Sequence, residues 1–400
     1  MQISRTKVVV AGAGPVGSVA ASLLAQQGID VILLEAGPDN AADLRASTFH
    51  PPTLELLDRI GIADPLINRG LKAPVYHFRE RQSGEVVEFD LSELADATRY
   101  PFRIQCEQYH LSRMLSEAVD KEQCAEVRFN NRVVGLHQNS TEVQVYVETP
   151  TAIERVDADF LIGADGSNSL VRKWLTTDFT GFTYPEKFLC FSTPCPLDEK
   201  IPNLSYVNYV SDPEEWMVLL RVPSLWRVLV PASNEQSDEE LLGDEKKIDV
   251  FDRLVGDGAN VETKHRTIYR VHQRVVNEFV HGRVILAGDA AHLNNPIGGF
   301  GMNSGIHDVF NLCDKLVKIY GGGDAGNLLS KYGRQRFKTT HDFIQAQTIR
   351  NMEYLKEGSE NEHALRKAEL EAIKADPVQR RDFLLRQSMI QCLKQEELIE

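Results

Sequence analysis

The sequence predicts an α/β protein in which a mostly parallel sheet, flanked by helices, is joined to a β-rich unit and followed by C-terminal helices. Three observations support this fold class. Residues 8–35 follow the order strand, glycine-rich turn, helix, strand. Buried-strand patterns that end in glycine and aspartate recur near residues 160 and 285. Residues 328–400 are strongly charged and mostly helical in pattern.

The first of these units predicts a Rossmann-like dinucleotide-binding domain. The apolar run Val8–Val10 is typical of a buried strand, and the turn after it matches G-x-G-x-x-G with Gly12, Ala13, Gly14, Pro15, Val16 and Gly17. Gly12 permits the tight turn, Gly14 leaves room for a pyrophosphate, and Gly17 lets the next helix pack closely on the sheet. The second strand ends in Glu35, where an acid can bind a ribose hydroxyl, and Ala36, which begins the next loop, is a further cofactor-binding candidate. The motif alone does not separate NAD from FAD.

Composition excludes several other classes of protein. The chain has 400 residues, 42% of them apolar and 26% charged, which is ordinary for a globular protein. A net charge of −14 argues against sequence-nonspecific nucleic-acid binding, which needs a basic surface. Six cysteines without C-x-x-C or zinc-ligand spacing predict reduced thiols in a cytoplasmic protein, with no metal site. The sequence contains no run of about 18 apolar residues, so it predicts no membrane span.

Two later motifs lie at strand ends, where open α/β sheets bind their ligands. The strand Phe160–Ile162 runs into Gly163-Ala164-Asp165-Gly166, and the strand 283–287 runs into Gly288-Asp289-Ala290-Ala291-His292. A glycine-rich loop, Pro296–Asn303, and a helix to about Tyr320 follow the second motif. So many flexible and polar residues at one strand-to-helix junction favour a binding role over a structural turn.

We expect the chain to divide into three parts. The dinucleotide-binding domain comprises residues 1–73, 99–177 and 276–340, the β-rich substrate domain comprises 74–98 and 178–275, and a helical segment covers 341–400. Alternating apolar and polar residues predict a hairpin at 76–91, a β-ribbon within 129–147, and strands near 204–210, 217–222 and 226–230.

Taken together and in this order, the three motifs resemble the single-component, FAD-dependent aromatic hydroxylases of the para-hydroxybenzoate hydroxylase family, over about residues 6–336. The resemblance implies an NAD(P)H-dependent FAD monooxygenase that hydroxylates a small aromatic or heteroaromatic substrate with O2, through a flavin C4a-hydroperoxide. NADH or NADPH is then a transient reductant, and the family, like this sequence, has no second Rossmann motif for it. The oligomeric state stays open, with a homodimer as one alternative.

The resemblance also implies roles for individual residues. The first motif, with Glu35, holds the ADP part of FAD, and Asp165 and Gly166 serve both FAD and NAD(P)H. The Gly288-Asp289 motif contacts the ribityl and pyrophosphate portion. Beside the flavin ring lie Pro296, Gly299, Gly301, Met302 and Asn303. A family arginine and a family glutamine that touch FAD correspond to Arg45 and to Gln108, with Gln105 as the alternative.

The catalytic residues are less well defined. Phenol hydroxylation needs a deprotonation or a hydrogen bond that raises the electron density of the ring, so polar residues of the β-rich sheet are candidates: Tyr206, His77 and Arg221. The carbonyl of Pro296 is a further candidate. Two departures from the family pattern affect this site: Asn295-Pro296 replaces the two prolines of many relatives, and Tyr332-Gly333-Arg334-Gln335-Arg336 lacks the usual acidic residue after its tyrosine.

Other functions stay open at this point. One alternative is an FAD-dependent reductase or oxidase of the same fold, and another is a non-catalytic flavin-binding sensor. Halogenation is disfavoured because the three tryptophans do not form a W-x-W-x-I-P signature. A membrane-associated hydroxylase would need a basic amphipathic anchor, and the sequence shows none.

Overall fold

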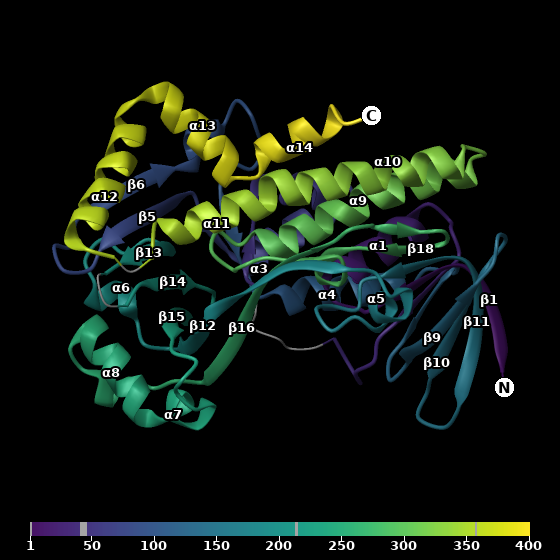
Figure 1. The fold of residues 1–400 in the computed structure, drawn as a ribbon, viewed down its shortest axis with the longest axis horizontal. Helices are drawn as coiled ribbons and strands as arrows, with labels where there is room; N and C mark the ends of the chain where they lie inside the picture. The colour runs from purple at the N-terminus through teal and green to yellow at the C-terminus, as the bar shows by residue number, and fades with distance from the viewer. Residues whose placement is uncertain (1, 41–45, 213–214, 357) are drawn as a thin grey trace.

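The computed structural model describes residues 2–40, 46–212, 215–356 and 358–400. Two eight-stranded sheets and a small three-stranded sheet form the framework of this part of the chain. The first sheet lies at the right of Figure 1 and the second at the left. The long helices α9 (Phe300–Tyr320) and α10 (Ala325–Lys338) run above the first sheet in this view, from the middle of the molecule to its right side. The expected α/β fold class is confirmed.

The first sheet has the parallel order expected of a dinucleotide-binding domain. The path β8-β2-β1-β11-β18-β17 combines Ala125–Arg128, Val31–Leu34, Ile3–Ala11, Ile153–Gly163, Val284–Leu286 and Val280–His281. Ala11 pairs with Gly163, and Gly163 pairs with Leu286. Because these three residues end their strands in register, the three glycine-rich motifs leave the sheet side by side.

An antiparallel ribbon extends this sheet. Strands β9 (Arg132–Gln138) and β10 (Val143–Glu148) pair with each other, and β10 pairs with the amino-terminal half of β11. This agrees with the ribbon expected within residues 129–147.

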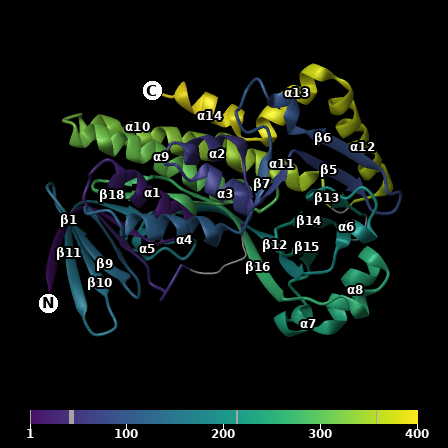
Figure 2. The same cartoon turned by 180° about the vertical axis from the view of Figure 1, so that it is seen from behind.

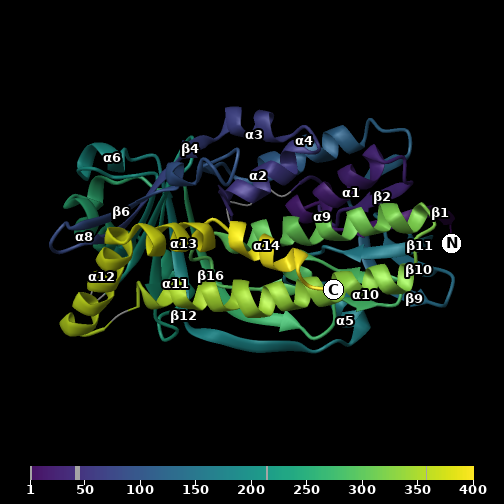
Figure 3. The same ribbon diagram turned by 90° about the horizontal axis from the view of Figure 1, so that it is seen from above.

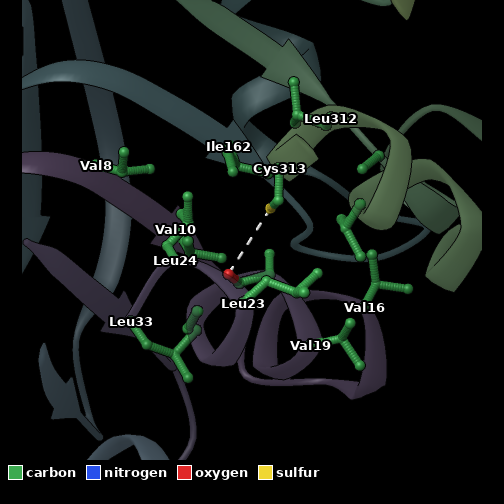
Figure 4. Packing of buried hydrophobic residues seen from close by; sticks show 14 of the residues in the cluster. Val8, Val10, Val16, Val19, Leu23, Leu24, Leu33, Ile162, Leu312 and Cys313 are labelled. Atoms are coloured by element: carbon green, nitrogen blue, oxygen red, sulfur yellow. Dashed lines mark hydrogen bonds between the residues drawn. The ribbon is translucent and has the colours of Figure 1, made fainter. Parts of the chain in front are cut away.

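The core of the first sheet is formed by close packing between α1 (Pro15–Gln26), the central strands and α9. Figure 4 shows Val10, Leu24 and Ile162 meeting Cys313, whose thiol donates to the Ala20 carbonyl at 3.8 Å. Glycine is required where α9 crosses α1, because a Cβ at Gly305 would lie 2.7 Å from a methyl of Val16. The turn that carries Gly288 is thereby held against the start of α1.

The second sheet has the order β19-β16-β12-β15-β14-β13-β5-β6. Its strands are His292–Leu293, His265–Val276, Phe179–Thr193, Trp226–Ala232, Met217–Arg221, Val207–Ser211, Val75–Glu80 and Val86–Asp90. The hairpin expected at 76–91 is therefore present and adds two strands to the edge of this sheet. Side chains alternate between the two faces along each strand.

Two helices in the β-rich segment were not expected from its strand-like pattern. Helices α7 (Asp238–Leu242) and α8 (Asp244–Val255) begin in an acidic stretch where Ser237 and Glu240 form a capping box. Their residues Leu241, Val250 and Phe251 pack on one face of the sheet, together with Leu189 and Phe191. The other face is left to line a cavity.

Further helices cover the remaining surfaces. Figure 2 shows α2 (Pro51–Asp58), α3 (Ala63–Arg69) and α4 (Gln108–Val119) on the side turned away from the viewer in Figure 1. A three-stranded sheet joins β3 (Thr48–Phe49), β7 (Arg103–Gln105) and β4 (Leu71–Ala73). Short helices η1 (Leu91–Leu94), α5 (Leu170–Leu175), α6 (Leu197–Lys200), η2 (Gly258–Asn260) and η3 (Gly288–Ala290) complete the two units.

The C-terminal residues are helical, as the sequence predicts. Figure 3 shows them folding back along the molecule as a π-helical turn η4 (Thr339–Gln345), α11 (Ala346–Glu353), α12 (Glu360–Ala375), α13 (Pro377–Gln387) and α14 (Ile390–Glu397). Within the ranges that the structure describes, none of the helices combines the length and apolar character needed to cross a membrane.

Candidate functional site

A cavity of about 820 Å³ joins the three motif turns to the inner face of the second sheet. Most of the residues that the sequence assigns to a cofactor line it. They are Gly14, Pro15, Val16, Glu35, Gln108, Gly166, Asp289, Pro296, Gly299, Gly301 and Met302. Residues from five strands of the second sheet, β12, β14, β15, β16 and β19, also line it.

Two helices begin at this cavity without a side-chain cap. Helix α1 starts after Gly14 and helix α9 starts after Gly299, and neither glycine can cap a backbone N–H group with a side chain. The first backbone N–H groups of a helix carry partial positive charge and bind anions such as phosphates. The cavity therefore has two regions that attract negative charge, one at the start of α1 and one at the start of α9.

The glycines of the first motif have different tasks. A Cβ at Gly12 would lie 2.4 Å from the carbonyl oxygen of Ala164, and Gly12 has φ +99°, so only glycine fits where the turn meets β11. At Gly14 a Cβ would meet no protein atom within 4 Å, because this position faces the open cavity. The backbone of Gly14 is thus left bare for a ligand.

Glu35 is fixed beside this turn. Its Oε2 accepts a hydrogen bond from Ala13 N at 2.8 Å, and its Oε1 accepts one from Gly37 N, also at 2.8 Å. Each carboxylate oxygen has a second lone pair, so the side chain can still accept from ligand hydroxyl groups.

The wall on the second sheet has an apolar part beside the polar residues Arg270, His272 and Arg274 of β16. Cys190, Val218, Leu220, Leu229, Ile268 and Val271 form the apolar part. Between them the side chains of Arg227 and Tyr269 approach each other, with 3.4 Å between Arg227 Nη2 and Tyr269 Oη. Arg227 Nη1 also lies 3.4 Å from Ser47 Oγ. A buried cation and a phenol hydroxyl thus meet within the apolar part of this wall.

Comparisons with known proteins agree with this geometry. Residues 5–347 match the family model described as an FAD binding domain. The chain belongs to the FAD-dependent aromatic hydroxylases. It is 31% identical to para-nitrophenol 4-monooxygenase of Pseudomonas sp. strain WBC-3, over 94% of both chains. It is also 32% identical to the 6-hydroxy-3-succinoylpyridine 3-monooxygenase HspB of Pseudomonas putida strain S16, over 88% of this chain and 91% of that one.

A solved structure supports the same assignment. The p-nitrophenol 4-monooxygenase PnpA from Pseudomonas putida DLL-E4 superposes with a TM-score of 0.91 at 29% identity, covering 97% of this chain and 99% of that one. FAD is therefore the cofactor of this hydroxylase, and the residues fit it. The bare backbone at Gly14 and the two uncapped helix N-termini suit an anionic dinucleotide.

Some predicted cofactor residues of the hydroxylase lie behind the cavity wall. A Cβ at Gly17 would lie 1.9 Å from the Gly12 carbonyl oxygen, and one at Gly288 would lie 2.9 Å from a methyl of Val16. These glycines allow α1 to approach its neighbours. Ala36 follows β2 and is not among the cavity-lining residues. Arg45 lies outside the described residues.

The Asp165 carboxylate is engaged in holding α5. It accepts from Leu170 N at 2.7 Å, Val171 N at 3.1 Å and Ser169 Oγ at 2.5 Å. Its neighbours Gly166 and Ser167 line the cavity. The carboxylate therefore shapes the turn of which Gly166 is part.

Hydrogen bonds from Asn303 and His50 stabilise the loop that begins at Pro296. Asn303 Oδ1 accepts from His50 N at 2.9 Å, and its Nδ2 donates to the carbonyls of Thr48 and Gly299 at 2.8 and 2.7 Å. His50 Nε2 donates to the Gly298 carbonyl at 2.8 Å. Burial holds the pKa of His50 well below its usual range, so the imidazole is neutral.

Three of the four catalytic candidates lie away from the cavity. Strand alternation places Arg221 with Met217 and Leu219 on the face turned to α7 and α8, where Arg221 lies over Trp226 at 5.8 Å. His77 is turned away from the cavity in the same manner and bonds Glu88 at 3.0 Å. Tyr206 precedes β13 and is 37% exposed. Pro296 lines the cavity, and its carbonyl accepts from Gly299 N at 3.0 Å.

Sequence reasoning missed Arg227, Tyr269 and Asn294, all of which line the cavity. The Asn294 Oδ1 atom is buried and has no hydrogen-bond partner in the part of the chain that the structure describes, so it can accept from a ligand. Arg227 and Tyr269 lie on strands whose inward face could have been identified only if the neighbouring strands were known. Of the two glutamines considered, Gln108 lines the cavity, whereas Gln105 is buried and accepts from Thr48 Oγ1 at 3.0 Å.

A cluster outside this cavity has groups that bind metals elsewhere. The ligand atoms of Cys106, Glu107 and His110 lie within 4.8 Å of one another. Burial raises the pKa of the Cys106 thiol to about 12, and Arg69 Nη1 lies 3.2 Å from His110 Nδ1. A protonated thiol and an adjacent cation oppose metal binding.

Proposed function

We propose that this hydroxylase is an NAD(P)H-dependent monooxygenase whose substrate is a single-ring phenol or a hydroxylated nitrogen heteroaromatic. The observation that carries the proposal is the position of Arg227 and Tyr269, which lie on the wall of the cavity that α9 opens onto. The full-length relatives named for para-nitrophenol and for a hydroxypyridine support a substrate of this size.

The chain supplies separate regions for the parts of FAD. We assign the ADP part to the turn from Gly12 to Gly17 with Glu35, and the ribityl and pyrophosphate part to Gly288 and Asp289. The loop from Pro296 to Asn303 would lie beside the flavin ring, where the N-terminus of α9 favours negative charge. Bound FAD, once reduced, supplies the activation of O2 and the transfer of one oxygen atom to the ring. We also assign Gln108, Asp165, Gly166 and Arg45 to the FAD region.

Arg227 and Tyr269 would hold the hydroxyl oxygen of the substrate. A guanidinium stays charged even when buried, so Arg227 favours the deprotonated phenol, whose ring is more electron-rich. Tyr269 donates a hydrogen bond to the same oxygen when it is deprotonated. The apolar residues around this pair position the ring and exclude water from it.

The remaining assignments follow from these roles. NADH or NADPH is the reductant. We infer that it binds transiently, because the sequence shows no second Rossmann motif to hold it. Six free cysteines agree with a reducing, cytoplasmic location. A homodimer is the oligomeric state that we would test first.

The deciding experiment is a substrate screen on purified protein. The absorbance of bound FAD is recorded first, and single-ring phenols and hydroxypyridines are then tested for acceleration of NADH or NADPH oxidation with matching O2 uptake. A hydroxylated product in proportion to the NAD(P)H consumed supports the proposal. NAD(P)H oxidation without O2 incorporation would indicate a reductase or oxidase, and no stimulation by any compound would indicate a binding protein.

A further inference from the structure

A second cavity, which shares no lining residue with the flavin cavity, lies between the β5–β6 hairpin and helix α12. Its volume is about 220 Å³. Figure 1 shows α12 beside this hairpin, at the edge of the second sheet. The residues of α12 that face it recur at helical spacing: His363, Arg366, Lys367, Leu370 and Glu371. The helix covers the sheet edge here without filling the space beneath it.

The wall opposite α12 is aromatic. Phe78 and Tyr209 stack at a centroid distance of 5.2 Å, and Tyr354 meets Phe78 edge to face at 5.6 Å. Val87 adds aliphatic surface on this wall, and Leu370 adds it from α12. Apolar cavities of about 150 Å³ in other proteins bind one benzene ring, so a cavity of 220 Å³ has room for a single substituted ring.

One polar atom in this cavity lacks a partner. His363 is 7% exposed, and its Nε2 has no hydrogen-bond partner among the residues that the structure describes. A buried imidazole nitrogen left unpaired costs free energy that a ligand hydroxyl recovers. The phenolic O–H of a ring lying against Phe78 and Tyr209 can serve as that partner.

The charges around the cavity favour a neutral ligand. The basic side chains are Arg79, Arg366 and Lys367, and the acidic ones are Glu80, Glu85 and Glu371. Lys367 forms an ion pair with Glu85, and Arg79 donates to the carbonyls of Pro202 and Asn203. The cations are therefore balanced, in contrast to the flavin cavity, whose lining includes Arg172, Arg227, Arg270 and Arg274.

We propose that this cavity is an accessory site for a small neutral phenol, which stacks on the Phe78–Tyr209 wall and hydrogen-bonds His363 Nε2. The residues from 354 to 371 that build half of it lie beyond the segment matched by the FAD-binding family model. Occupation of this site does not require turnover, so it can be tested whether or not the substrate has been found.

The test uses the FAD-loaded protein without reductant and 4-bromophenol as the probe, at pH 7, where this phenol is neutral. Crystals soaked with the probe are measured at the bromine absorption edge, and calorimetric titration gives the number of binding events in solution. We expect a bromine position within contact distance of the Phe78 ring and a binding event that belongs to this cavity.

Variants connect the two measurements. His363→Ala removes one hydrogen bond and should lower the affinity for 4-bromophenol at this cavity about fivefold. Leu370→Phe fills the space and should lower this affinity further. His341→Ala, an exposed histidine on η4, is the matched control and should change nothing. Retention of FAD absorbance verifies that each variant is folded.

The proposal is overturned if no bromine lies beside His363, if the crystal shows one but solution shows no corresponding event, or if both variants bind as the wild type does. Failure of the substrate screen would leave these results unchanged, because they measure binding alone.

Discussion

Arg336 and Asp308 form a fully buried ion pair, with 2.5 Å between Arg336 Nε and Asp308 Oδ1. Asp308 Oδ2 also accepts from Gly288 N and from His292 Nε2, each at 2.8 Å. Arg336 in turn pairs with Glu396 of α14. Residues 333–336 contain no acid, and Arg336 has its second carboxylate partner on α14. The C-terminus thereby stabilises the turn that carries Asp289.

The first prediction concerns this pair. Burial alone would raise the pKa of Asp308, but Arg336 and His292 outweigh burial and lower the pKa to about 2. Asp308→Asn leaves Arg336 with one buried partner fewer, so we expect a loss of about 3–5 kcal/mol in the free energy of unfolding. Urea titration of the FAD-loaded protein measures it. Asp314→Asn, in an exposed pair with Arg59, is the control and should cost less than about 1 kcal/mol.

The second prediction concerns Gly14. Gly14→Val should fold, because no protein atom lies within 4 Å of the added Cβ, yet it should lose FAD, because the side chain enters the cavity. Absorbance per purified chain measures the bound flavin. Gly333→Val, a helical glycine whose Cβ would meet Val280 at 3.6 Å, should retain it. Stoichiometric flavin in Gly14→Val would contradict the assignment of this turn to FAD.

The third prediction concerns Asp289, which lies in the turn after β18 and lines the flavin cavity. Asp289→Ala should weaken FAD binding by about tenfold or more, because a charged hydrogen-bond acceptor is removed at the ligand. Fluorescence titration of the apoprotein with FAD gives the dissociation constant. An unchanged constant would exclude a contact between this carboxylate and FAD.

The fourth prediction separates Arg227 from Arg221, which lie on neighbouring strands of the second sheet. Arg227→Gln should raise KM for a phenol substrate about tenfold to a hundredfold while FAD stays bound, because the substrate oxygen loses a charged donor. Arg221→Gln should leave KM unchanged, because its side chain lies on the opposite face with Trp226. Steady-state kinetics on the substrate from the screen decide it. A raised KM in Arg221→Gln with an unchanged KM in Arg227→Gln would mean that Arg221, and not Arg227, contacts the substrate.

The fifth prediction is a loss of stability in acid. Burial, followed by the charge of Arg336, lowers the pKa of His307 to about 3. The unfolded chain takes up a proton below about pH 6.5, and the folded chain does not do so until about pH 3, so stability falls as the pH falls through this window. His307 alone should cost about 1.4 kcal/mol at pH 5.5, and buried His50 acts in the same direction.

Urea unfolding at pH 7.5 and pH 5.5 measures this effect. His307→Gln should show a smaller loss between the two pH values than the wild type, whereas the exposed control His341→Gln should show the same loss. An equal loss in His307→Gln and the wild type would mean that His307 is protonated in the folded protein.

The sequence by itself determined the parts of the fold that depend on local pattern. The strand before Gly12, the turn up to Gly17 and the acid at Glu35 follow one another within a single unit, so their geometry is fixed by neighbours in the chain. The motif turns at Asp165 and Asp289 are likewise recognisable at strand ends. The flavin cavity could therefore be expected before any coordinates were known.

Only the tertiary structure decided which side chains complete the site. Arg227 and Arg221 look alike in the sequence, and the choice between them depends on which sheet face α7 and α8 cover. The pairing of Arg336 with Glu396 joins residues 60 positions apart, and the cavity beneath α12 depends on how that helix meets β5 and β6. Contacts of this kind are set by packing between distant segments, which no local pattern encodes.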